Sequence, residues 1–386
     1  MEKRFYWIYI TVFINVIASG MIFPILPLFA TSFNASSFQV GLLTAVFALT
    51  QFLAAPIIGQ MSDRYGRKPI FIFSIFTTAS ALFLIGISQN LGMIFFGMAI
   101  QGLGSAGVLP SALAYVADVA KGDNRTKYIS RVTGMFAFGF MIGPSVGGFL
   151  GSQSLSLPFY IATIIGVINL VIITLFLKET HHNRAKSLAV RQGLISPRIL
   201  ARALKGKFGL LFFLLFAWAF YISNYSLTIP FFTVEKFSFD TIQNGIFFSI
   251  VGFTAALTQW FVLPNIEKKI GDVKTIFLGL LMIFVGQSLA PFSFNPILFY
   301  VIFIISVIGS SLMRPSTNAL LSKRTTEGQG ATMGLAFSFE SSGRIVGPLI
   351  LGFIMASWNV TIPFYITALV VLIATVLFYK LEVQKN

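Results

Sequence analysis

The sequence predicts an all-α integral membrane protein with twelve transmembrane helices arranged as two pseudo-symmetric six-helix bundles. Hydrophobic residues make up 56% of the chain and charged residues only 10%, whereas soluble domains carry roughly 25% charged residues. The mean hydropathy is +0.86. Twelve apolar stretches are long enough to cross a bilayer, which takes about 20 residues, and the second half of the chain repeats the first at an offset close to 205 residues.

The expected spans divide evenly between the two halves of the chain. They lie near 5–31, 39–61, 69–88, 91–117, 131–151, 157–177, 208–233, 242–264, 275–294, 296–321, 331–356 and 361–381. An even number of crossings places both termini on the same side of the membrane.

The internal repeat falls on residues that bend or tighten membrane helices. Pro110-Ser111 returns as Pro315-Ser316, Gly143-Pro144 as Gly347-Pro348, and Leu157-Pro-Phe-Tyr-Ile161 as Ile362-Pro-Phe-Tyr-Ile366. Paired bundles of this kind are how many secondary transporters build one central site that faces either side in turn. We expect bundles at 1–178 and 208–386, joined by a charged linker at 179–207 with an amphipathic helix along Ile195–Leu204.

The basic residues predict the orientation of the chain. Cytoplasmic loops carry an excess of Lys and Arg, and on the predicted topology nearly all basic loop residues share one face, with Lys236 alone on the other. Both termini are therefore expected in the cytoplasm. The net charge of +15 reflects topology and contact with anionic membrane lipids, so we expect no nucleic-acid partner.

Several classes of site are excluded by composition. The chain has no cysteine, which removes disulfides, iron–sulfur clusters and thiol chemistry. Its two histidines, His181 and His182, both lie in the linker. The first apolar run lacks a cleavage site and is long enough to remain as a helix. We expect no cofactor, no metal site and no enzymatic activity.

The strongest local motif joins the second and third spans and reads Gly59-Gln-Met-Ser-Asp63-Arg64-Tyr-Gly66-Arg67-Lys68. Glycines permit a sharp turn, and a carboxylate beside basic residues exceeds what topology alone requires. The motif resembles the G-x-x-x-D-R-x-G-R-K signature of the major facilitator superfamily. The resemblance implies a conformational latch in which Asp63 contacts a helix N-terminus of the other half and Arg67 pairs with Asp118, locking the outward-facing state.

The corresponding loop of the second half differs from this motif. It reads Glu267-Lys-Lys-Ile-Gly271-Asp272-Val-Lys274 and is three residues shorter when counted from Pro264 rather than Pro56. We interpret it as a degraded latch, so the two halves are not expected to be equivalent.

A second motif lies in the fifth span and contains Gly139, Gly143, Pro144, Gly147 and Gly148. Glycines four residues apart let helices touch backbone to backbone, and proline bends a helix. The motif resembles that of drug:proton antiporters within the superfamily, and nearly the whole chain is similar to NorA-type multidrug exporters of Gram-positive bacteria. The chain departs from that pattern because Met98 replaces a helix-4 arginine, and Ser226 and Ser311 replace acids.

Three charged residues lie within the predicted spans: Arg314, Glu340 and Arg344. Such charges are costly in hydrocarbon and mark ion or substrate pathways. Arg314 and Glu340 each lie ~15 Å into the membrane at 1.5 Å per residue, so they can meet. A local Glu340–Arg344 pair and a static bridge between helices 10 and 11 are the alternatives. Our hypothesis is that Glu340 is the proton-coupling acid, with Asp118 as runner-up.

Polar residues at helical spacing mark a predicted substrate cavity. Lipid would penalise their polar atoms, and small-molecule sites combine apolar walls with few polar groups. The candidates are Asn15, Ser19, Gln51, Gln101, Ser105, Tyr221, Asn224, Tyr225, Gln259, Arg314 and Glu340.

The sequence as a whole favours a proton-driven exporter of amphiphilic drug-like compounds in a bacterial cell membrane, acting by alternating access as a monomer. Export or flipping of a lipid, a glycolipid or a specific metabolite is the alternative within transport. A non-transporting receptor is a third possibility, which the intact loop motif and the lack of an appended signalling domain disfavour.

Overall fold

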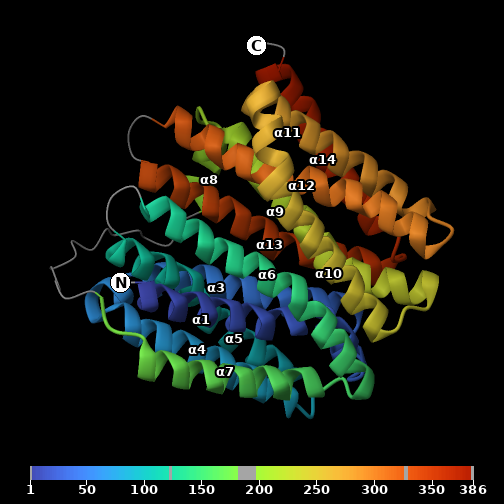
Figure 1. Ribbon diagram of the computed structural model, residues 1–386. Coiled ribbons are helices and arrows are strands. Elements are labelled where there is room, and N and C mark those ends of the chain that lie inside the picture. The colour runs from blue at the N-terminus through green and yellow to red at the C-terminus, as the bar shows by residue number, and fades with distance from the viewer. Residues whose placement is uncertain (1, 121–123, 181–196, 326–328, 384–386) are drawn as a thin grey trace. The chain divides into compact units, whose positions relative to one another are not determined.

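The computed structural model describes residues 2–120, 124–180, 197–325 and 329–383, and within these ranges it is helical with no strand (Figure 1). The helices of the first half are α1 (Glu2–Ile22), α2 (Leu26–Thr31), α3 (Ser37–Tyr65), α4 (Arg67–Gly86), α5 (Leu91–Val119), α6 (Asn124–Gln153) and α7 (Leu157–Phe176). Those that follow are α8 (Pro197–Leu204), α9 (Gly209–Phe237), α10 (Thr241–Leu257), α11 (Leu263–Leu289), α12 (Pro296–Arg324), α13 (Gln329–Ser357) and α14 (Ile362–Phe378).

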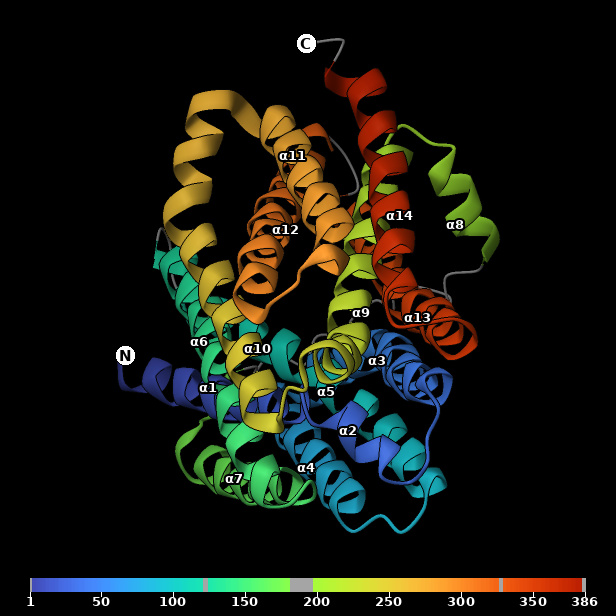
Figure 2. The ribbon, with the colours of Figure 1, turned by 90° about the vertical axis from the view of Figure 1, so that its right-hand side faces the viewer.

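The predicted fold class is confirmed. The described residues contain eleven helical segments long and apolar enough to span a membrane. One of them, Thr241–Phe292, has 52 residues, about 78 Å at 1.5 Å per residue, whereas the hydrocarbon layer is about 30 Å thick. It contains both predicted spans 242–264 and 275–294, and a non-helical residue, Gly271 with φ 77° and ψ 168°, separates them. In Figure 2 the chain of this segment, coloured yellow to orange, runs upward from α10 and then reverses direction within α11.

Two helices differ in detail from the expected continuous spans. The first predicted span, 5–31, is divided into α1 and α2 by a turn at 23–25, where Pro24 and Pro27 disfavour an uninterrupted helix. Between α10 and α11 a π-helical segment occupies Thr258–Val262. The amphipathic helix predicted along 195–204 is present as α8, and residues 195–196 lie outside the described ranges.

The chain forms two compact units that do not coincide with simple halves. Unit 1 consists of residues 1–35, 46–194 and 239–252, and unit 2 of residues 36–45, 195–238 and 253–386. In unit 1, α1 packs against α6 and α7, and α4 packs against α5 and α7. In unit 2, α9 packs against α13 and α14, and α11 packs against α12 and α14. The predicted bundle boundaries at 178 and 208 stay a prediction.

The N-terminal capping of equivalent helices is repeated in the two halves of the chain. The side chain of Asn90 accepts a hydrogen bond from the Met93 amide at 3.0 Å and begins α5. The side chain of Asn295 accepts from the Leu298 amide at 2.8 Å and begins α12. Asparagine is a favoured N-cap because its oxygen satisfies an otherwise unpaired helix amide. The repeat noticed in the sequence therefore extends to the capping of equivalent helices.

Candidate functional site

The turn between α3 and α4 holds a compact ionic network in unit 1. Gly66, with φ 109°, is the residue before α4, a conformation that glycine adopts without a steric penalty. The next residue, Arg67, donates from Nε to Asp118 at 3.0 Å and from Nη1 to Asp63 at 2.6 Å. The Arg67–Asp118 pair predicted from the family resemblance is present. The latch function of this network stays a prediction.

A residue outside the motif completes this network. Glu179, just beyond α7, accepts hydrogen bonds from the backbone amides of Arg67 at 3.0 Å and Lys68 at 3.1 Å. A Cβ atom at Gly66 would lie 2.5 Å from Glu179 Oε2, so the glycine also leaves room for this carboxylate. Sequence analysis missed Glu179, although Gly66 cannot supply a side-chain cap for α4. That missing cap was the available clue.

The remaining residues of the motif between α3 and α4 lie next to this network. The Lys68 side chain donates to the Thr174 carbonyl oxygen at 2.7 Å, tying α4 to α7. Arg64 lies over the Tyr65 ring, 5.4 Å from its centroid. Gly59 lies within α3, on the last two turns before the network.

The corresponding turn of unit 2 keeps an ion pair but reverses its polarity. Gly271 has a positive φ like Gly66, and the following residue, Asp272, accepts from Lys323 Nζ at 2.6 Å. At the repeat offset of 205, Asp272 corresponds to Arg67 and Lys323 to Asp118. The acid and the base have exchanged places, so the two turns are not equivalent, and the interpretation of the second loop as a degraded latch stays a prediction.

The glycine motif of α6 packs that helix directly onto α1. A Cβ at Gly139 would lie 2.8 Å from Val16 Cβ, and one at Gly143 would lie 2.8 Å from the Ile17 carbonyl oxygen. Gly147 faces the Met21 backbone, and a Cβ at Gly148 would lie 2.9 Å from Gly245 Cα. Beside Pro144, the Ser145 amide and hydroxyl bond Ser249 Oγ at 3.1 and 2.7 Å. The close backbone approach expected of this motif is therefore present.

The partial copy of the motif packs α13 onto α9 in unit 2 in the same way. A Cβ at Gly343 would lie 2.6 Å from the Phe216 carbonyl oxygen, and one at Gly347 would lie 2.6 Å from Ser223 Cβ. These two glycines correspond to Gly139 and Gly143 at an offset of 204.

The three charges predicted within the spans meet in unit 2, midway along α12 and α13. Arg314 donates from Nε and Nη2 to the two carboxylate oxygens of Glu340, at 3.0 and 2.9 Å. The Glu340 side chain is 8% exposed and that of Arg314 is 39% exposed. Within the described residues, Arg344 Nε is buried and has no hydrogen-bond partner. The predicted meeting of Arg314 with Glu340 is present, and the ion pair joins α12 to α13 rather than Glu340 to Arg344 on the same helix.

Trp218 on α9 lies beside both arginines of this cluster. The guanidinium carbon of Arg314 lies 4.5 Å from the indole centroid, and that of Arg344 lies 5.7 Å from it. An indole attracts cations through its negative face. Trp218, Arg314, Glu340 and Arg344, called the charge cluster below, thus bring three helices together around one carboxylate and two guanidiniums.

The polar candidates of unit 1 are buried or half-buried. Asn15 and Gln101 are each 7% exposed. Gln51 donates to Ser105 Oγ at 3.1 Å, which joins α3 to α5, and Ser19 is half-buried. Their roles in a substrate cavity stay a prediction.

The polar candidates of unit 2 fall into different environments. Tyr221 is 1% exposed and Tyr225 6% exposed. Asn224 is fully buried and donates to Gln287 Oε1 at 2.8 Å, so its amide group joins α9 to α11 rather than facing an open space. Gln259 is exposed within the π-helical segment.

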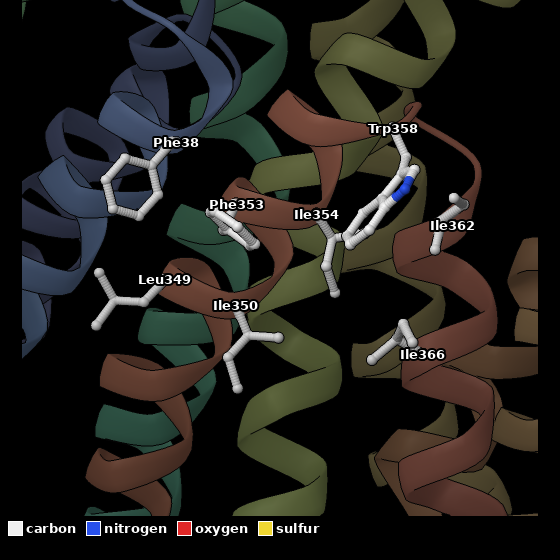
Figure 3. A pocket seen from close by; sticks show the side chains of 8 residues that line it. All are labelled: Phe38, Leu349, Ile350, Phe353, Ile354, Trp358, Ile362 and Ile366. Atoms are coloured by element: carbon white, nitrogen blue, oxygen red, sulfur yellow. The ribbon is translucent and has the colours of Figure 1, made fainter.

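An apolar groove lies on unit 2 at the junction of α13 and α14. Its volume is about 640 Å³, and Figure 3 shows the side chains that line it, which come from α3, α13, α14 and the turn between α13 and α14. The lining residues are Phe38, Leu349, Ile350, Phe353, Ile354, Trp358, Ile362 and Ile366. The indole nitrogen of Trp358 is the sole polar side-chain atom in this lining.

Comparison with known proteins gives one family across the chain. The model of the Major Facilitator Superfamily matches residues 8–264 and 261–386. Multidrug resistance protein 2 of Bacillus subtilis is 27% identical over 383 residues, which are 97% of this chain and 94% of that protein. The class H tetracycline resistance protein of Pasteurella multocida is 29% identical, covering 93% and 92% of the two chains. The quinolone resistance protein NorA of Staphylococcus aureus is 24% identical, covering 91% and 90%.

Solved structures show the same fold at lower sequence identity. The human organic anion transporter MFSD10 (TETRAN) superposes with a TM-score of 0.73 at 21% identity, covering 98% of this chain and 99% of that one. A bacterial homolog of the human lysosomal transporter Spinster superposes with a TM-score of 0.81 at 15% identity, covering 97% and 95%.

Proposed function

This chain belongs to the major facilitator superfamily, and we propose that it is a proton-coupled antiporter that exports amphiphilic drug-like small molecules by alternating access. Its similarity to proteins named for multidrug, tetracycline and quinolone resistance extends over more than nine-tenths of its length. In this proposal the chain acts as a monomer in the bacterial cytoplasmic membrane with both termini inside. It changes no bond in its substrate, and the proton gradient rather than a cofactor supplies the energy.

The observation that carries proton coupling is the fork between Arg314 and Glu340. Glu340 is 6% exposed as a whole residue, and it lies eleven residues into α13, or ~16 Å at 1.5 Å per residue. A carboxylate at this depth is costly unless it is paired. Its partner Arg314 is 39% exposed, and a guanidinium would not be exposed to hydrocarbon at such depth. We infer that water reaches this side of the cluster.

Proton binding at Glu340 would change the contacts of α12 with α13. The deprotonated carboxylate accepts two charge-assisted bonds from Arg314, which are roughly twice as strong as neutral ones. A proton on Glu340 removes this ionic attraction and leaves both guanidiniums without a counter-charge. Proton occupancy and the arrangement of the two helices are therefore linked. This linkage is the property that an exchanger needs at its coupling site.

Everted membrane vesicles test the proposal. A fluorescent amphiphilic dye should accumulate when the vesicle interior is acidified and should leak out when a protonophore collapses the gradient. Glu340→Gln should abolish gradient-dependent uptake while the variant remains folded in the membrane. If Glu340→Gln retained full gradient-driven uptake, Glu340 would not be the coupling acid. If the unmodified protein moved no dye from a broad panel, drug export itself would be wrong.

The apolar groove at the junction of α13 and α14 favours lipid export as the second candidate function. Its walls are apolar along their whole length, which suits an acyl chain better than a polar drug. Vesicles containing headgroup-labelled lipid provide the matched test. Gradient-dependent movement of the labelled headgroup without dye transport would favour this candidate over the first.

A further inference from the structure

The charge cluster of unit 2 contains two guanidiniums and one carboxylate. Its carboxylate, that of Glu340, is bound in the fork with Arg314. Two positive charges against one negative charge leave the cluster with one positive charge in excess. An unbalanced charge at this depth is costly, and an anion from solution would balance it.

Arg344 is the member of the cluster that this fork leaves out. It is half-buried, and within the described residues its Nε has no hydrogen-bond partner. A guanidinium presents five N–H donors in a planar fork, which suits the oxygens of an oxyanion. Arg344 is therefore a donor group for an anion that the described part of the chain does not supply.

Trp218 borders the approach to both guanidiniums. The Arg314 side chain is 39% exposed, and Trp218 is half-buried. The indole centroid lies 4.5 Å from the guanidinium carbon of Arg314 and 5.7 Å from that of Arg344. An aromatic ring packs favourably against an indole in an offset or edge-on arrangement. The geometry thus suits an aromatic compound with a carboxylate or sulfonate, its acidic group on the guanidiniums and its ring beside Trp218.

A proton on Glu340 and an anion at the guanidiniums compensate for each other. The proton alone would leave the cluster with two excess positive charges, and the anion alone would leave it neutral. Both together restore one excess positive charge, as in the empty cluster. In the loaded cluster the oxyanion of the ligand replaces the Glu340 carboxylate as the partner of Arg314. Binding of either one therefore favours binding of the other.

We propose that the charge cluster binds an aromatic organic anion together with a proton on Glu340, so that the protein also takes up acidic compounds by proton–anion cotransport. This activity goes beyond the proposed export of amphiphilic compounds. A cationic group competes with the proton for Glu340 and is exchanged for it, whereas an anionic group accompanies the proton. The charge of the compound then sets the direction of its transport. The binding site itself stands on the geometry of unit 2 and does not require drug export.

The proton is assigned to Glu340 because the other ionisable groups around α13 are bases, tyrosines or distant. The ionisable residues on the described helices packed against α13 are Arg198, Arg202, Tyr221, Tyr225, Glu235, Lys236, Tyr300, Arg314, Lys323, Arg324 and Tyr365. Tyrosine, lysine and arginine ordinarily keep their charge state between about pH 6 and 8. Glu235, the acid among them, follows Trp218 by 17 residues on α9, or ~26 Å at 1.5 Å per residue.

Calorimetric binding to the purified protein in detergent tests the site without any transport assay. The probes are a naphthalenesulfonate, which stays ionised at every pH used, and the matching neutral naphthalenesulfonamide. The sulfonate should bind more tightly as the pH falls, by up to about tenfold per pH unit, because one proton binds with it. The sulfonamide should show no such dependence. Sulfonate affinity that does not change with pH would overturn the shared proton.

Three variants assign the two halves of the site. Glu340→Gln imitates the protonated acid, so it should bind the sulfonate tightly at every pH. Arg344→Gln should weaken binding by about tenfold or more, as loss of a hydrogen bond to a charged group does. Lys269→Gln is the matched control, because it removes an equal charge from an exposed position of unit 2 and should leave the affinity unchanged. Weaker binding to Glu340→Gln, or equal losses in Arg344→Gln and Lys269→Gln, would overturn the assignment.

Proteoliposomes decide whether the bound anion is carried. Acidifying the outside should drive uptake of the sulfonate, and a protonophore should abolish that uptake. Sulfonate binding without gradient-driven uptake would overturn the cotransport. Dye export in everted vesicles is a separate measurement, so its failure would refute the proposed drug export while pH-linked sulfonate binding still supported the anion site.

Discussion

Two helix pairs of this chain pack through equivalent glycines, called the glycine scaffold below, and differ in the side chains beside those glycines. In unit 1, Gly139 and Gly143 pack α6 onto α1, and in unit 2, Gly343 and Gly347 pack α13 onto α9. At the same offset, Glu340 corresponds to Phe136 and Arg344 to Phe140. The two phenylalanine rings stack with centroids 6.5 Å apart, where unit 2 has a carboxylate and a guanidinium.

The difference shows that the glycine scaffold does not require the charges. Arg314 likewise corresponds to Leu109, the residue before the repeated proline. At the equivalent positions unit 1 has the apolar side chains of Leu109, Phe136 and Phe140, and burying an ion pair gains little over apolar packing. The charges of unit 2 therefore carry a desolvation cost that helix packing does not explain. A function that needs a titratable group at this depth does explain it.

The largest effect on export is expected when all three charges of the cluster are removed. Arg314→Leu/Glu340→Leu/Arg344→Leu gives these three positions apolar side chains, as the equivalent positions of unit 1 have. Apolar replacement of a buried ion pair typically leaves stability unchanged or raises it by ~1–4 kcal/mol, and we expect the lower end because Arg314 is 39% exposed. Gradient-driven export should disappear completely. The measurements are thermal unfolding in detergent and dye uptake by vesicles; a variant that unfolds would refute the view that the charges serve function alone.

Removing the acid alone should be worse for the fold. Glu340→Gln leaves Arg314 and Arg344 without a counter-charge. Breaking a buried pair from one side costs ~3–5 kcal/mol, and we expect the lower end because Arg314 is 39% exposed, so the variant is destabilised but still folds. The variant should therefore be less stable than the triple leucine variant, although it changes fewer residues. Glu267→Gln is the control, because Glu267 accepts a hydroxyl bond from Ser316 at 2.6 Å and is not part of the charge cluster. Equal unfolding temperatures for Glu340→Gln and the triple variant would contradict this ranking.

Substitutions in the glycine scaffold itself should affect both units alike. Gly143→Ala and Gly347→Ala each push a methyl group into a neighbouring helix, and overpacking typically costs ~1–3 kcal/mol. The unfolding temperature should fall by a similar amount in both variants. Gly334→Ala on α13 is the control, because no described atom lies within 4 Å of its added Cβ. A loss in only one unit would show that the two scaffolds are not equivalent.

The sequence predicted the features that depend on spacing and composition. Twelve apolar runs and the repeated Gly-Pro positions were sufficient for the fold class. Counting residues from the helix ends predicted that Arg314 and Glu340 could meet, because helical rise is constant. The family resemblance supplied the Arg67–Asp118 pair. These are local regularities that any helix of this composition must obey.

Contacts between segments distant in sequence were not predictable. The missing side-chain cap at Gly66 indicates that α4 needs a partner but not that Glu179 is that partner, since the two are brought together only by packing of α4 against α7. The reversed polarity of Asp272 and Lys323 can be read from the sequence at the 205-residue offset, but their contact, across 51 residues of chain, depends on packing. The burial of Asn224 against Gln287 required the register of α9 on α11. Helix register is set by packing rather than by hydropathy.

The smallest predicted effect concerns the indole of the charge cluster. Trp218 follows Phe216 by two residues as Asn15 follows Phe13, and Phe216 and Phe13 face equivalent glycines, so unit 1 has an amide in this place. Trp218→Phe keeps an aromatic ring but weakens the cation–π attraction, which is worth ~0.5–2 kcal/mol. Export should persist at a reduced rate. Double-mutant cycles with Arg314→Gln and Arg344→Gln apportion the effect, and the coupling should be larger for Arg314, whose guanidinium lies at 4.5 Å from the ring rather than 5.7 Å. A larger coupling to Arg344 would mean that Trp218 acts mainly on Arg344 rather than on the Arg314–Glu340 pair.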